Sequence, residues 1–187
     1  MHFPNNDLSG ERGALSQSLI DAGIQDLYEA VSFLKNLTYG RTTNKYDFKS
    51  VINEKRGTCS SKHGALSILF DENLIKHSLI LGVFKMNSVN TPEISSVLNR
   101  HRIEYIPEAH CYIKVSGQVI DISNKNSSPE MWINDLLEER EINPSDIATL
   151  KEKLHKNFLK TCELKPPFIE FNVNQLWEIR EECIQKL

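Results

Sequence analysis

The feature that most constrains the fold is a pair of short segments, residues 110–115 and 118–123, separated by the dipeptide Ser116-Gly117. Two alternating runs joined by two turn residues predict an antiparallel β-hairpin. Continuing the pairing away from this turn places His110 opposite Ser123. The hairpin therefore fixes which residues of the two strands can meet across the ladder.

This register gives the hairpin two chemically different faces. One face is apolar except for Gln118 beside the turn and is expected to point to the core, with Cys111, Ile113, Val115, Ile120 and Ile122. The opposite face carries His110, Tyr112, Lys114, Val119, Asp121 and Ser123. Asp121 is then the diagonal cross-strand neighbour of His110, within reach of an imidazole–carboxylate hydrogen bond. The pattern predicts a His–Asp pair on the face turned away from the core.

A second pattern places a cysteine at the start of a helix. Thr58 is a suitable N-cap, Gly57 allows a sharp turn into the helix, and a buried stripe follows at Ala65, Leu66, Leu69 and Phe70. At a helix N-terminus, backbone N–H groups and the positive end of the helix dipole favour thiolate over thiol. The same N–H groups can hold the oxyanion of a tetrahedral intermediate. Cys59 is therefore a candidate nucleophile.

A nucleophilic thiol needs a base, and the base needs an acceptor that orients it. Cys59, His110 and Asp121 fill these three roles in that order. His63 is a rival base because it lies four residues after Cys59 on the same helix, but a packed or solvated helix residue is the simpler interpretation. A metal site of Cys59, His63, His110 and Cys111 is disfavoured, because adjacent strand residues point to opposite faces.

The rest of the chain predicts an α+β class, because helices precede and follow the strands instead of alternating with them. We expect helices over 14–37, 129–141, 145–160 and 174–186, a short helix after Thr91-Pro92, and strands over 79–84 and 168–173. A length of 187 residues indicates a single domain, 1–187. Its core is expected at 14–125, followed by a mostly helical C-terminal extension at 126–187.

Composition disfavours several classes of partner. The chain has 22 Lys and Arg against 25 Asp and Glu, so it lacks the basic surplus of a nucleic-acid or anionic-membrane protein. The cysteines form no C-x-x-C pair, which indicates free thiols in a reducing compartment. No secretory signal is evident, and the longest apolar stretch is far short of the roughly 20 residues that span a bilayer. We expect a cytoplasmic protein without nucleic-acid or membrane partners, and its oligomeric state stays open.

Gly57-Thr58-Cys59 at a helix start, His110 opening a strand, and Asp121 eleven residues later at the end of the next strand resemble the transglutaminase-like superfamily. The resemblance covers about residues 14–125. It implies a papain-like cysteine-proteinase fold, in which N-terminal helices pack on an antiparallel sheet. It also implies Cys59 as nucleophile, His110 as general base and acid, and Asp121 as the residue that orients His110.

The same resemblance implies chemistry on an amide bond of a protein, peptide or small molecule through an acyl-thioester. Members of the superfamily include crosslinking enzymes, peptidases, peptide N-glycanases, deamidases and proteins that have lost catalysis. A non-catalytic binding or scaffold module is therefore the alternative. Asn53, six residues before Cys59, is a candidate oxyanion donor by analogy with the papain-like glutamine. The resemblance implies no metal or other cofactor, and no motif matches the calcium sites of the animal crosslinking enzymes.

Overall fold

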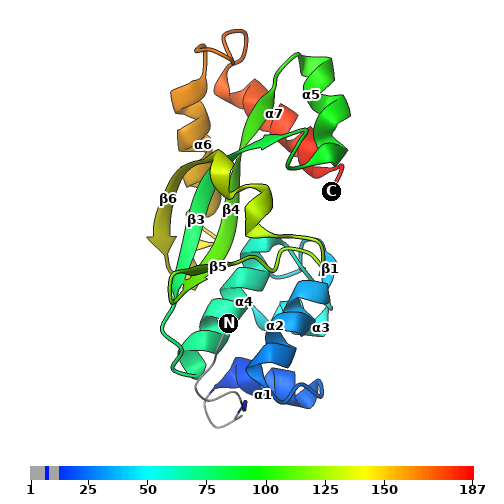
Figure 1. Ribbon diagram of the computed structural model, residues 1–187, viewed down its shortest axis with the longest axis vertical. Coiled ribbons are helices and arrows are strands. Elements are labelled where there is room, and N and C mark those ends of the chain that lie inside the picture. The colour runs from blue at the N-terminus through cyan, green and yellow to red at the C-terminus, as the bar shows by residue number, and fades with distance from the viewer. Residues whose placement is uncertain (1–6, 9–12) are drawn as a thin grey trace. The chain divides into compact units, whose positions relative to one another are not determined.

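The computed structural model describes residues 7, 8 and 13–187 and is a mixed α+β protein (Figure 1). Its α-helices are α1 (Ala14–Asp21), α2 (Leu27–Asn36), α3 (Lys49–Asn53), α4 (Cys59–Glu72), α5 (Ser95–His101), α6 (Lys151–Cys162) and α7 (Val173–Ile184). Its strands are β1 (Thr38–Tyr39), β2 (Arg56–Gly57), β3 (Ser78–Asn87), β4 (Tyr105–Val115), β5 (Gln118–Ile120) and β6 (Leu136–Ile142). The larger sheet has the order β5-β4-β3-β6, and β1 pairs with β2 in parallel. The predicted α+β class is confirmed.

The predicted hairpin is confirmed in the pairing of β4 with β5. Ile113 pairs with Ile120, Lys114 with Val119 and Val115 with Gln118, which is the expected antiparallel register. Ser116 and Gly117 have φ angles of 48° and 78°, the left-handed conformation that a two-residue hairpin turn requires. The ladder ends at Ile120, so the predicted pairing of His110 with Ser123 falls beyond its last paired residues.

Burial of the hairpin residues differs from the expectation on one face. The five apolar residues of the predicted core face are buried, and Gln118 beside the turn is exposed. On the other face, Tyr112, Asp121 and Ser123 are also buried, with exposed fractions of 0%, 5% and 5%. The prediction that Asp121 would stand away from the core was therefore wrong, because protein covers this face of the hairpin as well. A buried carboxylate must have hydrogen-bond partners.

The helix predicted after Thr58 is confirmed as α4. Thr58 Oγ1 accepts a hydrogen bond from the Ser61 N–H, and Ser61 Oγ accepts one from the Thr58 N–H, forming a capping box. The expected apolar stripe is buried, but so are the polar residues of the first turns, including Lys62 and His63. Contacts from α1, α2 and α3 surround this helix (Figure 1). α4 is thus a central helix buried on all sides instead of an amphipathic surface helix.

The single helix predicted over 14–37 is wrong: α1 and α2 replace it. Gly23 has a φ of 87° and follows the end of α1, while the Asp26 side chain accepts a hydrogen bond from the Glu29 N–H at 2.8 Å and caps α2. A left-handed glycine ends one helix and a side-chain cap begins the next. The apolar spacing continues across the break, so periodicity alone does not reveal it.

The C-terminal expectations are only partly confirmed. The short helix after Thr91-Pro92 and the helix near 174–186 are present, as Pro92–Ile94 with α5 and as α7. The helix predicted over 129–141 is wrong: the short 3-10 turns Pro129–Met131 and Ile133–Asp135 lead into β6. The helix expected over 145–160 begins later, at Lys151, and residues 168–173 form no strand.

Tertiary pairing explains the change at β6. This strand lies at the edge of the sheet beside β3, and residues 137–141 are exposed. Charged side chains on an exposed edge are a common protection against unwanted strand pairing. The sequence of this segment, taken alone, predicts a solvated helix. Pairing with β3 makes it a strand instead, because strand formation depends more on the neighbouring strand than on local propensity.

The chain divides into two compact units. The first contains Met1–Leu81, Cys111–Pro129 and Arg140–Ala148, and the second contains Gly82–His110, Glu130–Glu139 and Thr149–Leu187. The boundary passes between His110 and Cys111 within β4. Cys59 and Asp121 therefore belong to the first unit, and His110 belongs to the second. The limits predicted for the domain, the core and the C-terminal extension stay predictions.

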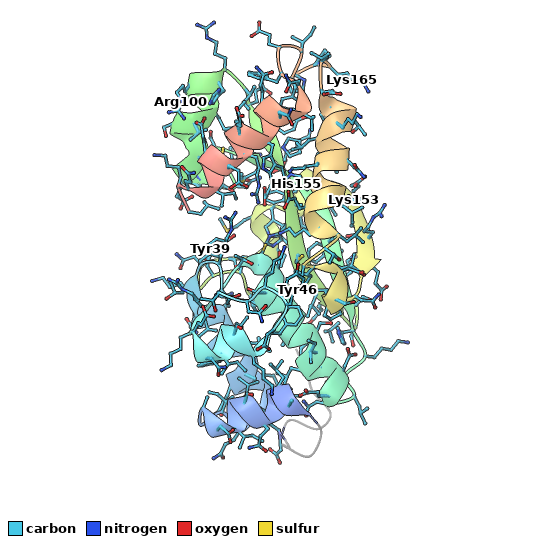
Figure 2. The ribbon with its side chains drawn as sticks, turned by 180° about the vertical axis from the view of Figure 1, so that it is seen from behind. Tyr39, Tyr46, Arg100, Lys153, His155 and Lys165 are labelled. Carbon is cyan, nitrogen blue, oxygen red and sulfur yellow. The ribbon has the colours of Figure 1, made fainter. Side chains whose placement is uncertain are left out.

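Within the second unit, buried polar contacts fasten α6 and α7 to β4. Arg180 donates to both carboxylate oxygens of Glu108, at 2.6 and 2.7 Å, and its guanidinium lies 5.2 Å from the centre of the Trp177 ring. The His155 ring meets the Trp177 ring edge-on at 5.3 Å, and its Nε2 donates to the Pro107 carbonyl at 2.8 Å (Figure 2). Helices of the C-terminal extension are thus tied to the strand that carries His110.

None of the helices found in residues 13–187 is both long and apolar enough to cross a lipid bilayer.

Candidate functional site

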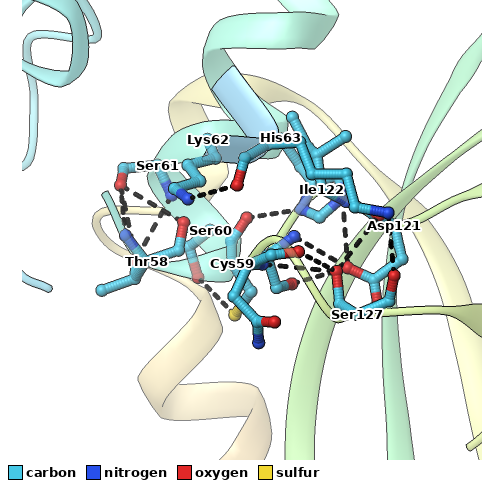
Figure 3. A network of polar contacts seen from close by, with 12 residues as sticks. Thr58, Cys59, Ser60, Ser61, Lys62, His63, Asp121, Ile122 and Ser127 are labelled. Atoms are coloured by element: carbon cyan, nitrogen blue, oxygen red, sulfur yellow. Dashed lines mark hydrogen bonds and ion pairs between the residues drawn. The ribbon is translucent and has the colours of Figure 1, made fainter. Parts of the chain in front are cut away.

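Cys59 is the first residue of α4 and follows the N-cap residue Thr58, as the sequence predicts. Its exposed fraction is 5%, and its Sγ lies 3.7 Å from the Ser60 hydroxyl (Figure 3). The first turn of a helix presents backbone N–H groups and the positive end of the helix dipole. Cys59 therefore stands where negative charge on sulfur, or on a nearby oxyanion, is favoured.

Asp121 follows the last residue of β5 and has a side chain that is 1% exposed. Its Oδ1 accepts hydrogen bonds from the Ser123 N–H at 2.9 Å and from the Ser123 hydroxyl at 2.7 Å. The Asp121 backbone carbonyl accepts a bond from the Ser127 hydroxyl at 3.3 Å. These bonds hold both the carboxylate and its backbone in one orientation, as a buried charge requires.

His63 links Cys59 to the segment that carries Asp121 (Figure 3). The Ile122 N–H donates to His63 Nε2 at 2.9 Å, so Nε2 is unprotonated. The proton of the neutral ring is then on Nδ1, which donates to the Cys59 carbonyl at 2.6 Å. Asp121 Oδ1 lies 3.8 Å from Nε2.

This geometry decides between the two interpretations of His63. Its side chain is fully buried, and backbone groups engage both ring nitrogens. A ring held in this way has no nitrogen directed at the Cys59 sulfur to accept its proton. His63 is therefore a packed structural residue, and the rival role as base is not supported.

Lys62 is a buried charged residue close to Cys59 on α4 that the sequence reasoning did not single out. Its side chain is fully buried, and its Nζ donates to the carbonyls of Leu37 at 2.6 Å and Lys35 at 3.3 Å. Burial lowers the pKa of Lys62 to about 8, although the negative charges of Asp121 and Cys59 raise it. The signal in the sequence is its place three residues after Cys59, on the same side of the helix.

His110 lies on β4 in the second unit, between aromatic rings of that unit. The Trp132 ring meets the imidazole edge-on, with 4.9 Å between centroids, and the Phe84 ring does so at 5.9 Å. Trp132 is 6% exposed and stands between the two 3-10 turns before β6. Edge-to-face contacts of this kind hold a ring without using its nitrogens. Sequence periodicity placed Trp132 on a helix and missed this contact.

Hydrogen bonds through His63 connect the segments that carry two of the predicted site residues, Cys59 and Asp121. Within the first unit, the His63 bridge joins Cys59 to the segment of Asp121, and Lys62 lies on the same helical turn as Cys59. The triad with His110 stays a prediction. Asn53 is the exposed last residue of α3, and its role as an oxyanion donor also stays a prediction.

The remaining cysteines occupy different surroundings. Cys111 and Cys183 are buried, whereas Cys162 is partly exposed. Burial raises the pKa of the Cys162 thiol and raises that of Cys183 to about 11. Among the residues that the structure describes, no three His, Cys, Asp or Glu side chains are grouped to hold a metal ion.

The likeness of this chain to known proteins is slight. No protein-family model matches the sequence, and no curated protein sequence matches it. A solved structure from Cytophaga hutchinsonii, described as a candidate cysteine protease, aligns with a TM-score of 0.42 and 15% identity. The alignment covers 80% of this chain and 47% of that one. A likeness this distant assigns the chain to no family.

Proposed function

We propose that the protein is a cysteine-nucleophile enzyme that acts on amide bonds, with Cys59 as nucleophile, His110 as general base and acid, and Asp121 as the residue that orients His110. The observation that carries the proposal is the position of Cys59 on the capped N-terminus of α4, joined through His63 to the segment of the buried Asp121 carboxylate. The transglutaminase-like order of Cys, His and Asp supports it. The substrate class is a protein, peptide or small amide.

In the proposed reaction, the Cys59 thiolate attacks the amide carbonyl carbon and a carbon–sulfur bond forms. The oxyanion of the tetrahedral intermediate is held near the N-terminus of α4. The carbon–nitrogen bond then breaks while protonated His110 gives its proton to the leaving amine. The product of this half-reaction is an acyl-thioester and a neutral imidazole.

The second half-reaction regenerates the thiolate. His110 removes a proton from water or from an acceptor amine, which attacks the thioester carbon and expels the Cys59 sulfur. Water gives hydrolysis, whereas an amine gives acyl transfer. The identity of the acceptor that reaches the thioester decides between the two outcomes.

Cys162 supplies an internal control for the activated thiolate. It is more exposed than Cys59, but burial raises its pKa. We expect iodoacetamide near pH 7 to alkylate Cys59 faster than Cys162, as measured by mass spectrometry of the two peptides. Faster labelling of the more buried thiol would show activation and not access. Labelling of Cys162 alone would contradict the proposal.

A non-catalytic binding or scaffold module is the second candidate. Its supporting observation is the burial of Cys59, which exposes only 5% of its surface. An amide-directed electrophile distinguishes the two functions when the native chain is compared with Cys59→Ala. The enzyme requires labelling that the substitution abolishes, whereas a scaffold shows no labelling of either chain.

A further inference from the structure

We infer that Lys62 is a positioning residue whose buried ammonium ion provides the fixed positive charge that favours the anionic forms of Cys59 and Asp121. The inference rests on the proposed function, because it assigns Lys62 a role toward the Cys59 thiolate. Lys62 touches no substrate in this account and acts through its two acidic neighbours.

The first support is the way in which the ammonium ion is held. Lysine side chains are almost never fully buried without partners. Lys62 Nζ donates to the carbonyls of Lys35 and Leu37, at the C-terminal end of α2. Carbonyls at a helix C-terminus carry partial negative charge and stabilise a cation. The charge is thus fixed in place by backbone groups that cannot titrate.

The second support is the space made for the lysine stem beside the cysteine. A Cβ added to Gly57 would lie 2.7 Å from Lys62 Cγ and 2.9 Å from Ser61 Oγ. Only a residue without a side chain leaves this path open, since carbon atoms do not approach so closely. The glycine two residues before Cys59 therefore serves the packing of Lys62 as well as the turn into α4.

The third support is the charge that surrounds Lys62. Cys59 lies one helical turn before it on α4, and Asp121 follows β5. His63 on the same helix is neutral in the observed tautomer, and α2 presents the two carbonyls. Both Asp121 and Cys59 interact electrostatically with Lys62 and oppose the effect of its burial. Because electrostatic coupling is reciprocal, the Lys62 cation in turn favours the Asp121 carboxylate and the Cys59 thiolate.

A purely structural Lys62 would only cap α2, so the test needs a readout of charge. The rate at which iodoacetamide alkylates Cys59 is measured against pH in the native chain, Lys62→Met and Lys62→Arg. We expect Lys62→Met to raise the pH midpoint by about one unit and to slow alkylation at pH 7 about tenfold. Lys62→Arg keeps the charge and should stay close to the native midpoint. A folded Lys62→Met variant with an unchanged midpoint would overturn the inference.

A second measurement tests the inference without Lys62→Met, in case that variant does not fold. The Lys62 side chain is titrated by NMR in two chains that carry isotope-labelled lysine, the native chain and Cys59→Ser. Loss of the thiolate should move the Lys62 titration to lower pH, and an unchanged titration would contradict the inference. If Cys59 is inert while Lys62 responds to its substitution, the proposed enzyme fails and the coupling stands. If Cys59 is reactive and neither measurement responds, the role of Lys62 alone fails.

Discussion

At the scale of single residues, His63 shows how backbone groups can hold a histidine that lies close to the candidate nucleophile Cys59. Backbone groups at 2.6 and 2.9 Å occupy its two ring nitrogens and set its tautomer. The ring therefore serves as a rigid connection between α4 and the segment after β5. Its proximity to Cys59 in the sequence suggests a base, but the direction of its hydrogen bonds decides otherwise.

His63→Ala is expected to destabilise the fold without removing an essential base. The substitution leaves the Cys59 carbonyl and the Ile122 N–H in a buried site without this partner. Each lost partner costs about 1–3 kcal/mol, so the free energy of unfolding should fall by roughly 2–5 kcal/mol in urea denaturation. At temperatures where the variant is folded, the pH profile of Cys59 alkylation should keep the native shape. Loss of the inflection assigned to the base would instead implicate His63.

Lys62 and Asp121 show what sequence reasoning can and cannot find at this scale. Asp121 is found because the hairpin register carries information about which residues are neighbours. Lys62 is missed because a lysine in a helix is ordinarily exposed, and nothing local shows that α2 supplies carbonyls to its ammonium ion. The buried cation depends on a contact between distant segments, which no window of sequence contains.

At the scale of elements, the entry of the chain into α4 depends on the absence of a side chain at Gly57. Gly57→Ala places a methyl group 2.7 Å from Lys62 Cγ, so part of this packing must shift. We expect a loss of about 1–3 kcal/mol in the free energy of unfolding, together with slower alkylation of Cys59. Gly40→Ala is the matched control, because its Cβ would lie 3.6 Å from the nearest atom, an ordinary contact. Equal stability of the two variants would contradict this account of Gly57.

The elements also divide into those that local rules determine and those that pairing determines. The hairpin and the start of α4 follow from turn and cap residues within the segments themselves, and both are confirmed. Local rules do not predict the break between α1 and α2, because the apolar spacing continues through it. They do not predict β6 either, because pairing with the neighbouring strand β3 determines it. Periodicity predicts elements well only where tertiary contacts agree with local preference.

At the scale of the whole molecule, the second unit contains a buried ion pair between Glu108 and Arg180, close in sequence to the candidate base His110. Glu108 lies on β4 two residues before His110 and accepts hydrogen bonds from Nε and Nη2 of Arg180 on α7. Burial alone would raise the pKa of Glu108, but the charge and hydrogen bonds of Arg180 outweigh it and lower the pKa to about 2. This pair fastens α7 to the strand that carries His110.

Arg180→Met should strongly destabilise the second unit near neutral pH. Removing one partner of a buried ion pair costs about 3–5 kcal/mol. Glu108→Met with Arg180→Met removes both charges of the buried pair and should recover much of the loss, since Glu181, the other partner of Arg180, is partly exposed. Because the folded-state pKa of Glu108 lies below its unfolded value, its contribution is present above that unfolded value and is lost as pH falls toward about 2. Thermal unfolding between pH 7 and pH 2 should show a larger acid loss of stability in the native chain than in the double variant. An equal acid loss in both would contradict the assignment to Glu108.

The central claim, that Cys59 is a nucleophile served by His110 and Asp121, is tested most directly by the rate of labelling with an amide-directed electrophile at pH 7. The native chain should be labelled once, at Cys59. His110→Gln should slow this labelling about 10²–10⁴-fold, the range that one general base contributes, and Asp121→Asn should slow it in the same direction. Circular dichroism is used to confirm that both variants are folded. Labelling of folded His110→Gln at the native rate, or no labelling of the native chain, would contradict the account.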